Sequence, residues 1–330
     1  MKKSELRKEI KNRKRQFTSQ QLSELSFAVI MRLLAHQRLK DARTVMLYYS
    51  LPDEVYTHTL VDALLAAGIE PYVTLYHWDL PLWQYKKGGW LKKDIIDDFA
   101  FYVKAVVEAL SDRVTYWITF NEPSCFLMNG YMQGVHAPFK HRYLALPKFT
   151  KIFMLTNRRA VETIRKYAKK KPLIGLSFAS GAFIPNDESD PKSVEEAYNK
   201  SFNVTMGTMN NRWRMDPILL GKPVTAYGIY ATHKKDMPRF KADFDFLAVN
   251  HYEAFNYSAW GGDKSIDKSK LNTTSLGWVI DGRSIYWKLK VLYRRYRHGK
   301  QRQHNGRRSQ GRCAHRLYQR LPFKCQKSHR

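Results

Sequence analysis

Apolar residues recur at helical spacing in two stretches near the start of the chain, over residues 2–39. The first stretch is basic, and the second begins near Thr18 and Ser19, with Gln21 three residues after Thr18 as in a capping box. The predicted core stripe of the second helix consists of Leu22, Leu25, Ile30, Leu33 and Leu34. The pattern therefore predicts two helices before the first strand.

The next stretch has the composition of a strand followed by a helix. Residues 44–51 are rich in β-branched and aromatic side chains, and Pro52-Asp53 ends this predicted strand. A helix is predicted from about Thr57 to Ala67, with Gly68 in the position that usually ends a helix.

Beyond residue 70, predicted strands and helices alternate at the spacing of βα units. The predicted strands cover residues 71–77, 114–120, 172–179 and 244–251, and the predicted helices cover residues 95–110, 151–169, 195–213 and 284–296. The four strands resemble part of a (β/α)8 barrel, in which strand carboxyl ends carry the chemistry. The predicted fold class is α/β, with an incomplete TIM barrel of about strands three to six.

Three of these strands end in polar and aromatic residues suited to a sugar. The clusters are His77-Trp78-Asp79, Asn121-Glu122-Pro123 and Asn250-His251-Tyr252. Taken singly, such a pair is more often structural, and a Glu before Pro is often a charge at a helix start. Three such strand ends, in the order expected of a barrel, favour a sugar-binding site over the structural interpretation.

Charge is distributed unevenly along a chain whose formal net charge is +28. Residues 1–60 carry 12 basic and 6 acidic groups, residues 61–281 carry 29 and 23, and residues 282–330 carry 16 and 0. The excess therefore belongs mostly to a tail. A tail that binds nucleic acid non-specifically remains one interpretation of it.

The cysteines are few and scattered, at Cys125, Cys313 and Cys325, which argues against a disulfide framework or a zinc site. The basic amino terminus has no apolar segment behind it, and no run approaches the length of a membrane span. A soluble cytoplasmic protein with no metal and no cofactor is expected.

Several motifs beyond residue 60 are similar to the signature blocks of glycoside hydrolase family 1, the β-glucosidase and 6-phospho-β-glucosidase family. They are PYVTLYHWDLP, DRVTYWITFNEP, GYMQGVHAP, FDFLAVNHY and LGWVIDGRSIYWKLKVLYRRY. The resemblance covers about residues 60–297 and implies a β-glucoside-type substrate, plain or phosphorylated. One departure is Phe139, where the family usually has Gly after His-Ala-Pro.

The family resemblance also implies roles for individual residues. Glu122 would be the general acid/base, and Asn121 would hold the sugar 2-hydroxyl. The other residues that it places in the same subsite are His77, Trp78, Asn250 and Tyr252, with Tyr252 facing the nucleophile.

The family's nucleophile is the Glu of a Thr-Glu-Asn-Gly strand, which should follow the helix at Ile285 to Tyr296. The corresponding stretch here is RHGKQRQHNGRRSQGRC, which has no carboxylate. Asn305-Gly306 is the candidate remnant, with His304 in the nucleophile's place. Little or no turnover is therefore expected, because the double displacement of a retaining glycosidase starts at that group.

The acid-free tail also suggests a shifted reading frame. Codons permitted for residues 312–329 can be chosen so that a one-base shift reads DARTDYINAFLSNVKKAI, which resembles the family's next helix. The hypothesis is that residues from about 298 onward are frameshifted and do not fold as barrel.

The amino terminus resembles a different family, the 5-formyltetrahydrofolate cyclo-ligases, over about 65 residues. The motifs are KKSELRKEIKNRKRQF and VMLYYSLPDEVYTHTLVDALLAAG. The resemblance implies that Lys3 and Arg7 approach ATP phosphates and that Leu51, Glu54 and Tyr56 line a folate pocket. The ligase's later nucleotide loop is absent, so that activity should be lost. The expected division is a ligase-like segment over 1–60, a partial barrel over 61–297 and a tail over 298–330.

Overall fold

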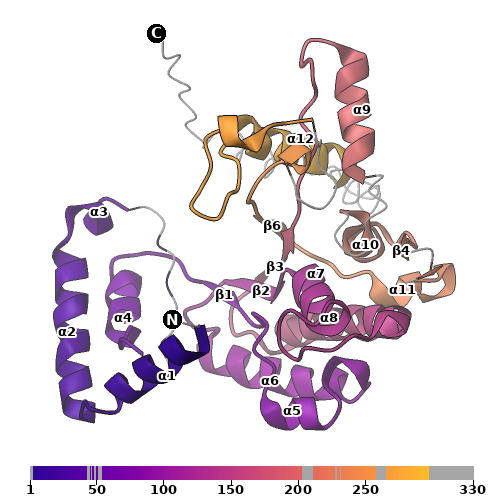
Figure 1. Ribbon diagram of the computed structural model, residues 1–330. Helices are drawn as coiled ribbons and strands as arrows, with labels where there is room; N and C mark the ends of the chain where they lie inside the picture. Colours follow the sequence, from indigo (N-terminus) through magenta and orange to yellow (C-terminus); the bar gives the residue numbers. More distant parts are fainter. Residues whose placement is uncertain are drawn as a thin grey trace.

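A four-stranded parallel sheet organises the main body of the protein. The computed structural model describes residues 3–42, 45, 47, 50, 54–202, 211–226, 229–230, 232–257 and 265–296. The strands, in their order across the sheet, are β1 (Tyr72–Thr74), β2 (Tyr116–Asn121), β3 (Leu173–Ala179) and β6 (Phe246–Asn250). Every neighbouring pair is parallel, which confirms the predicted α/β class, and Figure 1 shows the four strands near the centre of the molecule.

Long helices follow these strands along the chain. They are α6 (Ile95–Leu110), α8 (Leu146–Tyr167), α9 (Pro191–Phe202) and α12 (Gly282–Tyr296). The helix predicted over 95–110 is confirmed at both ends. The helix predicted over 151–169 begins earlier, because Pro147 lies in its first turn, where its missing N–H leaves no hydrogen bond unmade.

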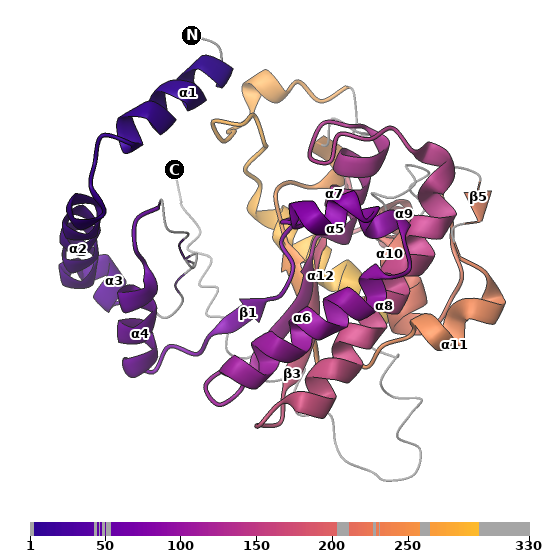
Figure 2. The ribbon, with the colours of Figure 1, turned by 90° about the horizontal axis from the view of Figure 1, so that it is seen from below.

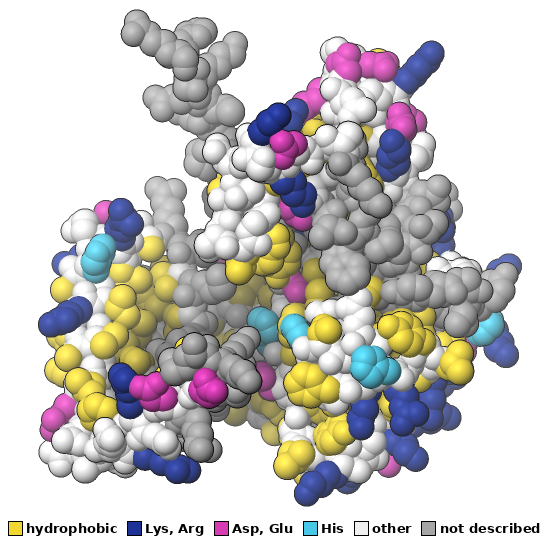
Figure 3. Space-filling view, viewed as in Figure 1, with side chains coloured by type: hydrophobic (Ala, Val, Ile, Leu, Met, Phe, Trp, Pro, Cys, Tyr) yellow, Lys and Arg dark blue, Asp and Glu magenta, His cyan; other side chains and the backbone are white. Residues whose placement is uncertain are grey.

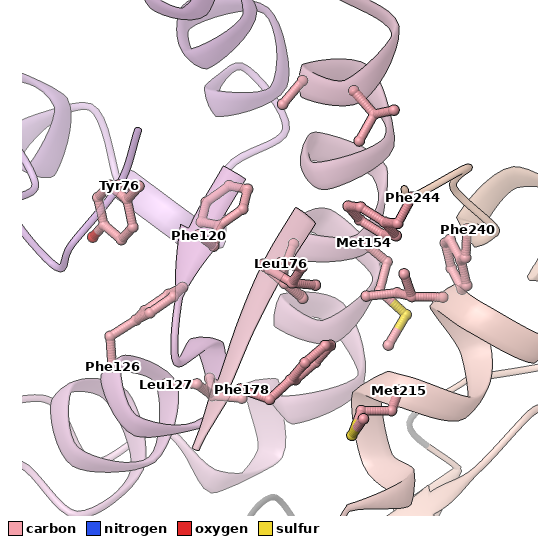
Figure 4. Close-up of a cluster of buried hydrophobic side chains, with 14 of the residues drawn as sticks. Tyr76, Phe120, Phe126, Leu127, Met154, Leu176, Phe178, Met215, Phe240 and Phe244 are labelled. Carbon is pink, nitrogen blue, oxygen red and sulfur yellow. The ribbon is translucent and has the colours of Figure 1, made fainter. Parts of the chain in front are cut away.

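Helices α6 and α8 pack together on one face of the sheet (Figures 1 and 2). Phe99 of α6 stacks on Phe120 of β2 with ring centroids 4.9 Å apart. Figure 4 shows Phe120, Leu176 and Met154 in this buried cluster, contributed by β2, β3 and α8. The apolar face of each helix thus fixes the strands whose ends carry the polar residues.

The opposite face of the sheet carries a smaller group of aromatic rings. Tyr72 and Tyr116 stack with centroids 4.2 Å apart, and the Phe246 ring lies 5.9 Å from that of Tyr72. Gly175 is required here, because an added Cβ would come within 2.3 Å of the Phe246 ring. The rings lie toward the amino ends of the strands, opposite the polar ends.

The amino-terminal helices lie to one side of the sheet (Figures 1 and 2). They are α1 (Lys3–Lys14), α2 (Ser19–Ala35), α3 (Gln37–Lys40) and α4 (His58–Ala66). The capping box at Thr18 and Gln21 is confirmed. Gly68, with φ of 80°, follows α4 as predicted. No strand occurs among the described residues before α4, and of the strand predicted over 44–51 only residues 45, 47 and 50 are described.

The predicted core stripe of α2 is partly wrong. Ile30 is 3% exposed and packs with Leu60 and Leu64 of α4. Leu25 and Leu33 are 53% and 42% exposed. Within the described part of the chain, α2 packs mainly against α3 and α4, which leaves part of the predicted stripe exposed, and Figure 3 shows hydrophobic side chains gathered on this side of the molecule.

The remaining described elements are short. They are α5 (Leu82–Lys86), α7 (Pro123–Leu127), α10 (Arg212–Met215), β4 (Thr225–Ala226), β5 (Ile229–Tyr230) and α11 (Met237–Phe240). The helix predicted over 195–213 is therefore seen as α9 and α10, on either side of residues that are not described. Among all described helices, none combines the length and the apolar character needed to cross a membrane.

Candidate active site

The carboxyl ends of β1, β2 and β6 bring the predicted sugar-site residues together. Asn121 ends β2 and Asn250 ends β6, so both lie at the same edge of the parallel sheet. His77 follows β1 and joins them through Asn121, whose Nδ2 lies 3.0 Å from His77 Nε2. The sheet topology alone therefore assembles residues that are far apart in sequence.

Glu122 is the most enclosed member of the site, with 2% of its surface exposed. Its Oε1 accepts hydrogen bonds from Asn250 Nδ2 at 2.6 Å and from Tyr252 Oη at 2.7 Å. Its backbone N–H donates to the Ser177 carbonyl at 2.9 Å. The backbone φ of Glu122 is 44°, a region that costs energy for a residue with a Cβ and is often found at functional sites.

A directed chain of hydrogen bonds orients the amides. Ser177 Oγ donates to Asn250 Oδ1 at 3.2 Å, and Asn250 Nδ2 also donates to Asn121 Oδ1 at 2.9 Å. Asn121 Nδ2 is then left to donate to His77 Nε2. The indole N–H of Trp78 donates to the backbone carbonyl of Asn121 at 2.9 Å, which fixes the indole ring beside that residue. Both amides therefore have one defined orientation.

The site combines buried and open groups. Asn121 is 7% exposed and Tyr252 is 47% exposed. The Tyr252 ring lies 4.9 Å from the Trp278 ring, and His77 is also exposed. Amides, a carboxylate and aromatic faces next to solvent are the groups that recognise a sugar's hydroxyls and its apolar face.

Burial raises the pKa of Tyr252, and its hydrogen bond to Glu122 adds to this effect. Both causes favour the neutral hydroxyl over the anion. Tyr252 therefore keeps its proton and acts on Glu122 as a donor.

Lys288 of α12 also belongs to the site, although the sequence did not single it out. Its side chain is fully buried, and its Nζ donates to the Asn250 carbonyl. Burial lowers its pKa to about 7, which the nearby Glu122 carboxylate only partly opposes. The signal in the sequence was its place between Ser284 and Val291 on the buried face of α12.

His251 lies behind the site. Its Nε2 lies 2.7 Å from Ser284 Oγ, and that hydroxyl donates to the Asp281 carbonyl at 2.6 Å. His251 Nε2 must therefore carry the proton of this bond, which leaves the buried Nδ1 as an acceptor with no hydrogen-bond donor among the described residues. Burial and the Lys288 charge lower the pKa of His251 to about 4, so the ring is neutral at neutral pH.

The described residues contain no second carboxylate hydrogen-bonded to this group of side chains. Tyr252, expected to face a nucleophile, donates to Glu122 itself. The candidate remnant at His304 and Asn305-Gly306 lies outside the described residues. No cluster of three or more His, Cys, Asp or Glu suited to a metal ion occurs in the part that is described.

The residues predicted for a folate ligase site lie elsewhere. Leu51 and the side chains of Lys3 and Arg7 are outside the described residues. Glu54 and Tyr56 precede α4, where Tyr56 N–H donates to Ser26 Oγ at 3.1 Å and its ring lies 4.3 Å from that of His58. Glu54 and Tyr56 are therefore not among the residues at the carboxyl ends of the strands.

Two family models match the sequence. The model described as glycosyl hydrolase family 1 matches residues 54–306, which includes Asn305-Gly306. The model described as the 5-formyltetrahydrofolate cyclo-ligase family matches residues 1–93. The two matches overlap over residues 54–93, more widely than the few residues beyond residue 60 that the two sequence resemblances share.

Curated relatives include several β-glucosidases. Beta-glucosidase A of Thermotoga maritima is 32% identical over 246 residues, which cover 73% of this chain and 54% of that protein. A 1,4-beta-D-glucan glucohydrolase of Thermotoga neapolitana is also 32% identical, with 57% of its length covered. The chain thus spans about half the length of the curated relatives it matches.

Solved structures agree with this match. A family 1 β-glucosidase from Thermotoga maritima superposes with a TM-score of 0.57 at 32% identity, over 72% of this chain and 54% of that one. The Thermotoga maritima β-glucosidase in complex with deoxynojirimycin gives 0.60 at 29% identity, over 83% of this chain and 63% of that one. The sheet therefore corresponds to part of a TIM-barrel-like fold.

Proposed function

Because the chain belongs to glycosyl hydrolase family 1, we propose that its strand ends form the sugar-binding half of a retaining β-glucosidase site, with Glu122 as the proton donor. The observation that carries this proposal is the pair of hydrogen bonds from Asn250 and Tyr252 to Glu122 Oε1. Both donors use one oxygen, so the proton for a leaving group would reside on Oε2.

The neighbouring groups suit a β-glucoside. Asn121 and His77 lie within one hydrogen-bonded chain and can each bond a ring hydroxyl. Trp78 and Tyr252 offer aromatic faces to the apolar side of a sugar ring. The supporting relatives are named β-glucosidase or 1,4-beta-D-glucan glucohydrolase, and the proposed ligand is a β-glucoside, plain or 6-phosphorylated.

Hydrolysis is proposed to be absent or reduced by several orders of magnitude. A retaining mechanism needs a nucleophilic carboxylate about 5 Å from the proton donor, and it attacks the anomeric carbon before water does. Glu122 can protonate the glycosidic oxygen, but residues 297–330, where the family's nucleophile strand is expected, contain no Asp or Glu for the attack. The site would therefore bind a glucoside without cleaving it.

The chain is proposed to be a fusion of unlike parts. Residues 1–60 would descend from a folate cyclo-ligase, residues 61–297 from the glycosidase, and residues 298–330 from a shifted reading frame. The ligase match supports the first part. Ligase turnover is not expected, because the chain lacks the later nucleotide loop. Sequencing the encoding DNA across 54–93 and 298–330 tests the fusion: the account requires a frame that encodes a Thr-Glu-Asn-Gly strand.

The function itself is tested with 4-nitrophenyl β-glucoside. Binding is followed by tryptophan fluorescence, and release of nitrophenol is followed in parallel. The wild-type chain should bind without measurable release, and E122Q should weaken binding while E108Q, at an exposed glutamate of α6, should not. Rapid release abolished by E122Q would contradict the proposed loss of hydrolysis, and no binding by folded chain would contradict the sugar site.

A further inference from the structure

The loop that follows Glu122 and α7 is cationic and borders the candidate sugar site. Residues 128–145, between α7 and α8, contain Lys140, Arg142, two His and no Asp or Glu. Within them, residues 135–142 form an exposed turn, called here the basic loop. The ring of His136 lies 5.5 Å from that of Trp78, whose indole N–H donates to the Asn121 carbonyl. The basic loop is therefore a wall of the site.

The basic loop is held in place by its backbone. The N–H groups of Val135 and His136 both donate to the Asn129 carbonyl, at 2.9 and 3.0 Å. Those of Lys140 and Arg142 donate to the carbonyls of Gly130 and Tyr131, at 2.9 and 2.7 Å. Gly130 lets the loop approach, because an added Cβ would lie 2.6 Å from the Ala137 carbonyl oxygen. These hydrogen bonds therefore fix the backbone from which the cationic side chains extend.

The cations of the basic loop have no acidic partner among the described residues. Lys140 and Arg142 take part in none of the ion pairs seen there, and the Lys140 ammonium instead lies 5.4 Å from the centre of the Tyr85 ring. His136 and His141 likewise meet no carboxylate in that part of the chain. The positive charge of the basic loop is therefore not neutralised by a carboxylate of the described chain and is open to an anionic ligand.

Phe139 adds an exposed ring to the same loop. It is 64% exposed, and its φ is 56°. Among the described residues, the non-glycine residues with positive φ are Trp78, Glu122 and Phe139. Two of these belong to the candidate site, and strained backbone of this kind clusters at ligand-contacting positions. Phe139 thus shares a strained backbone conformation with two residues of the candidate site.

From this combination we propose that the basic loop selects β-glucosides whose aglycone is aromatic and negatively charged. The inference rests on the proposed function, in which Glu122 protonates the oxygen of the leaving group. The basic loop follows Glu122 and α7 in the chain and borders Trp78 through His136, so an aglycone that projects from the site on this side would meet it. An anionic aryl group would stack on Phe139 and lie among Lys140, Arg142 and the two histidines.

Three uncleaved ligands separate this proposal from its alternatives. They are neutral 4-nitrophenyl β-glucoside, 4-carboxyphenyl β-glucoside and 4-nitrophenyl 6-phospho-β-glucoside, with dissociation constants measured by calorimetry at low and high salt. The carboxyphenyl glucoside should bind about tenfold more tightly than the neutral one, and the ratio should fall as salt rises. The phosphorylated sugar should show no such gain.

Paired charge-removing variants locate the effect. K140Q/R142Q should bring the ratio close to one. K169Q/K170Q removes two exposed cations just before β3, at the opposite end of the strands, and should leave the ratio unchanged. Equal affinity for the carboxyphenyl and neutral glucosides, a gain for the phosphorylated sugar alone, or a gain that survives K140Q/R142Q would overturn this proposal while leaving the sugar site standing. Failure of folded chain to bind any of the three ligands would overturn both.

Discussion

Tyr252 Oη lies 2.7 Å from Glu122 Oε1 and donates a hydrogen bond to it. Glu122 follows β2, whereas Tyr252 follows β6, and β3 lies between those strands in the sheet. The contact therefore ties together two strand ends that do not pair directly. It also uses the hydroxyl that the family resemblance directed at a second carboxylate.

The first prediction concerns this bond. Y252F should lower the free energy of unfolding by about 1–2 kcal/mol, because a nearly buried carboxylate loses a donor. Urea denaturation followed by circular dichroism measures the change. Y286F, at an exposed tyrosine of α12, is the matched control and should have no effect. Equal losses in the two variants would show that the bond does not stabilise the fold.

The second prediction concerns Lys288, whose pKa falls from its ordinary value of 10.5 to about 7 through burial. Between these two values the unfolded chain binds more protons, so stability rises with pH across that range. The penalty of the buried ammonium is complete below about pH 7 and fades toward pH 10.5. K288M should therefore stabilise the protein by up to about 5 kcal/mol at pH 6 and by about 2 kcal/mol at pH 9.

Thermal unfolding at the two pH values tests this dependence. K290M, at an exposed lysine two residues along α12, provides the control, and its effect should not change with pH. A K288M effect that is the same at pH 6 and pH 9, or that destabilises at both, would contradict the assigned burial of the ammonium.

The third prediction concerns backbone strain in the basic loop. Phe139 has φ of 56° and is largely exposed, so F139G relieves strain at little cost in buried area. It should raise the free energy of unfolding by about 0.5–1 kcal/mol. Chemical denaturation measures this change in the free energy of unfolding. A lower stability of F139G than of the wild type would mean that the Phe139 ring contributes packing that outweighs the strain.

A glycine with the same kind of backbone gives the opposite test. Gly68 has φ of 80°, and an added Cβ would meet nothing within 4 Å. G68A should therefore destabilise the protein by about 1 kcal/mol through backbone conformation alone. An unchanged midpoint of unfolding would argue against the left-handed turn that ends α4.

The fourth prediction concerns the tail. Residues 298–330 are proposed to lie outside the barrel, so a chain that ends at Tyr296 should unfold at the same denaturant concentration as the full chain. Any salt-dependent binding of nucleic acid should be lost with the tail, because that segment holds much of the excess charge. A lower unfolding midpoint in the shortened chain would show that the tail contributes to the fold.

The elements predicted best from the sequence are those whose type and ends follow from their own spacing of apolar residues. Helix α6 begins and ends as predicted, because its apolar residues recur every three or four positions against a large core. The predicted core stripe of α2 was too wide, since burial of its residues depends on which element packs against the helix. The described elements cover one side of α2 only. Local pattern determines the element, and tertiary packing determines which face is buried.

The same division holds at the candidate site. The motif residues Glu122, Asn121 and Asn250 do lie together, because parallel strands place their carboxyl ends at one edge. Lys288 was missed, since a lysine in a helix otherwise suggests solvent. The bond from Tyr252 to Glu122 was also missed, because it depends on which carboxylates are present in the folded site.

The most direct test of the account is a calorimetric titration with deoxynojirimycin, the glucose-shaped amine in complex with the Thermotoga maritima relative. Its ammonium should pair with the Glu122 carboxylate while its hydroxyls bond the amides of Asn121 and Asn250. Wild-type chain should bind it with one-to-one stoichiometry, and E122Q should bind at least about tenfold more weakly. Folded wild-type chain that gives no heat of binding, or E122Q that binds equally well, would contradict a sugar site built on Glu122.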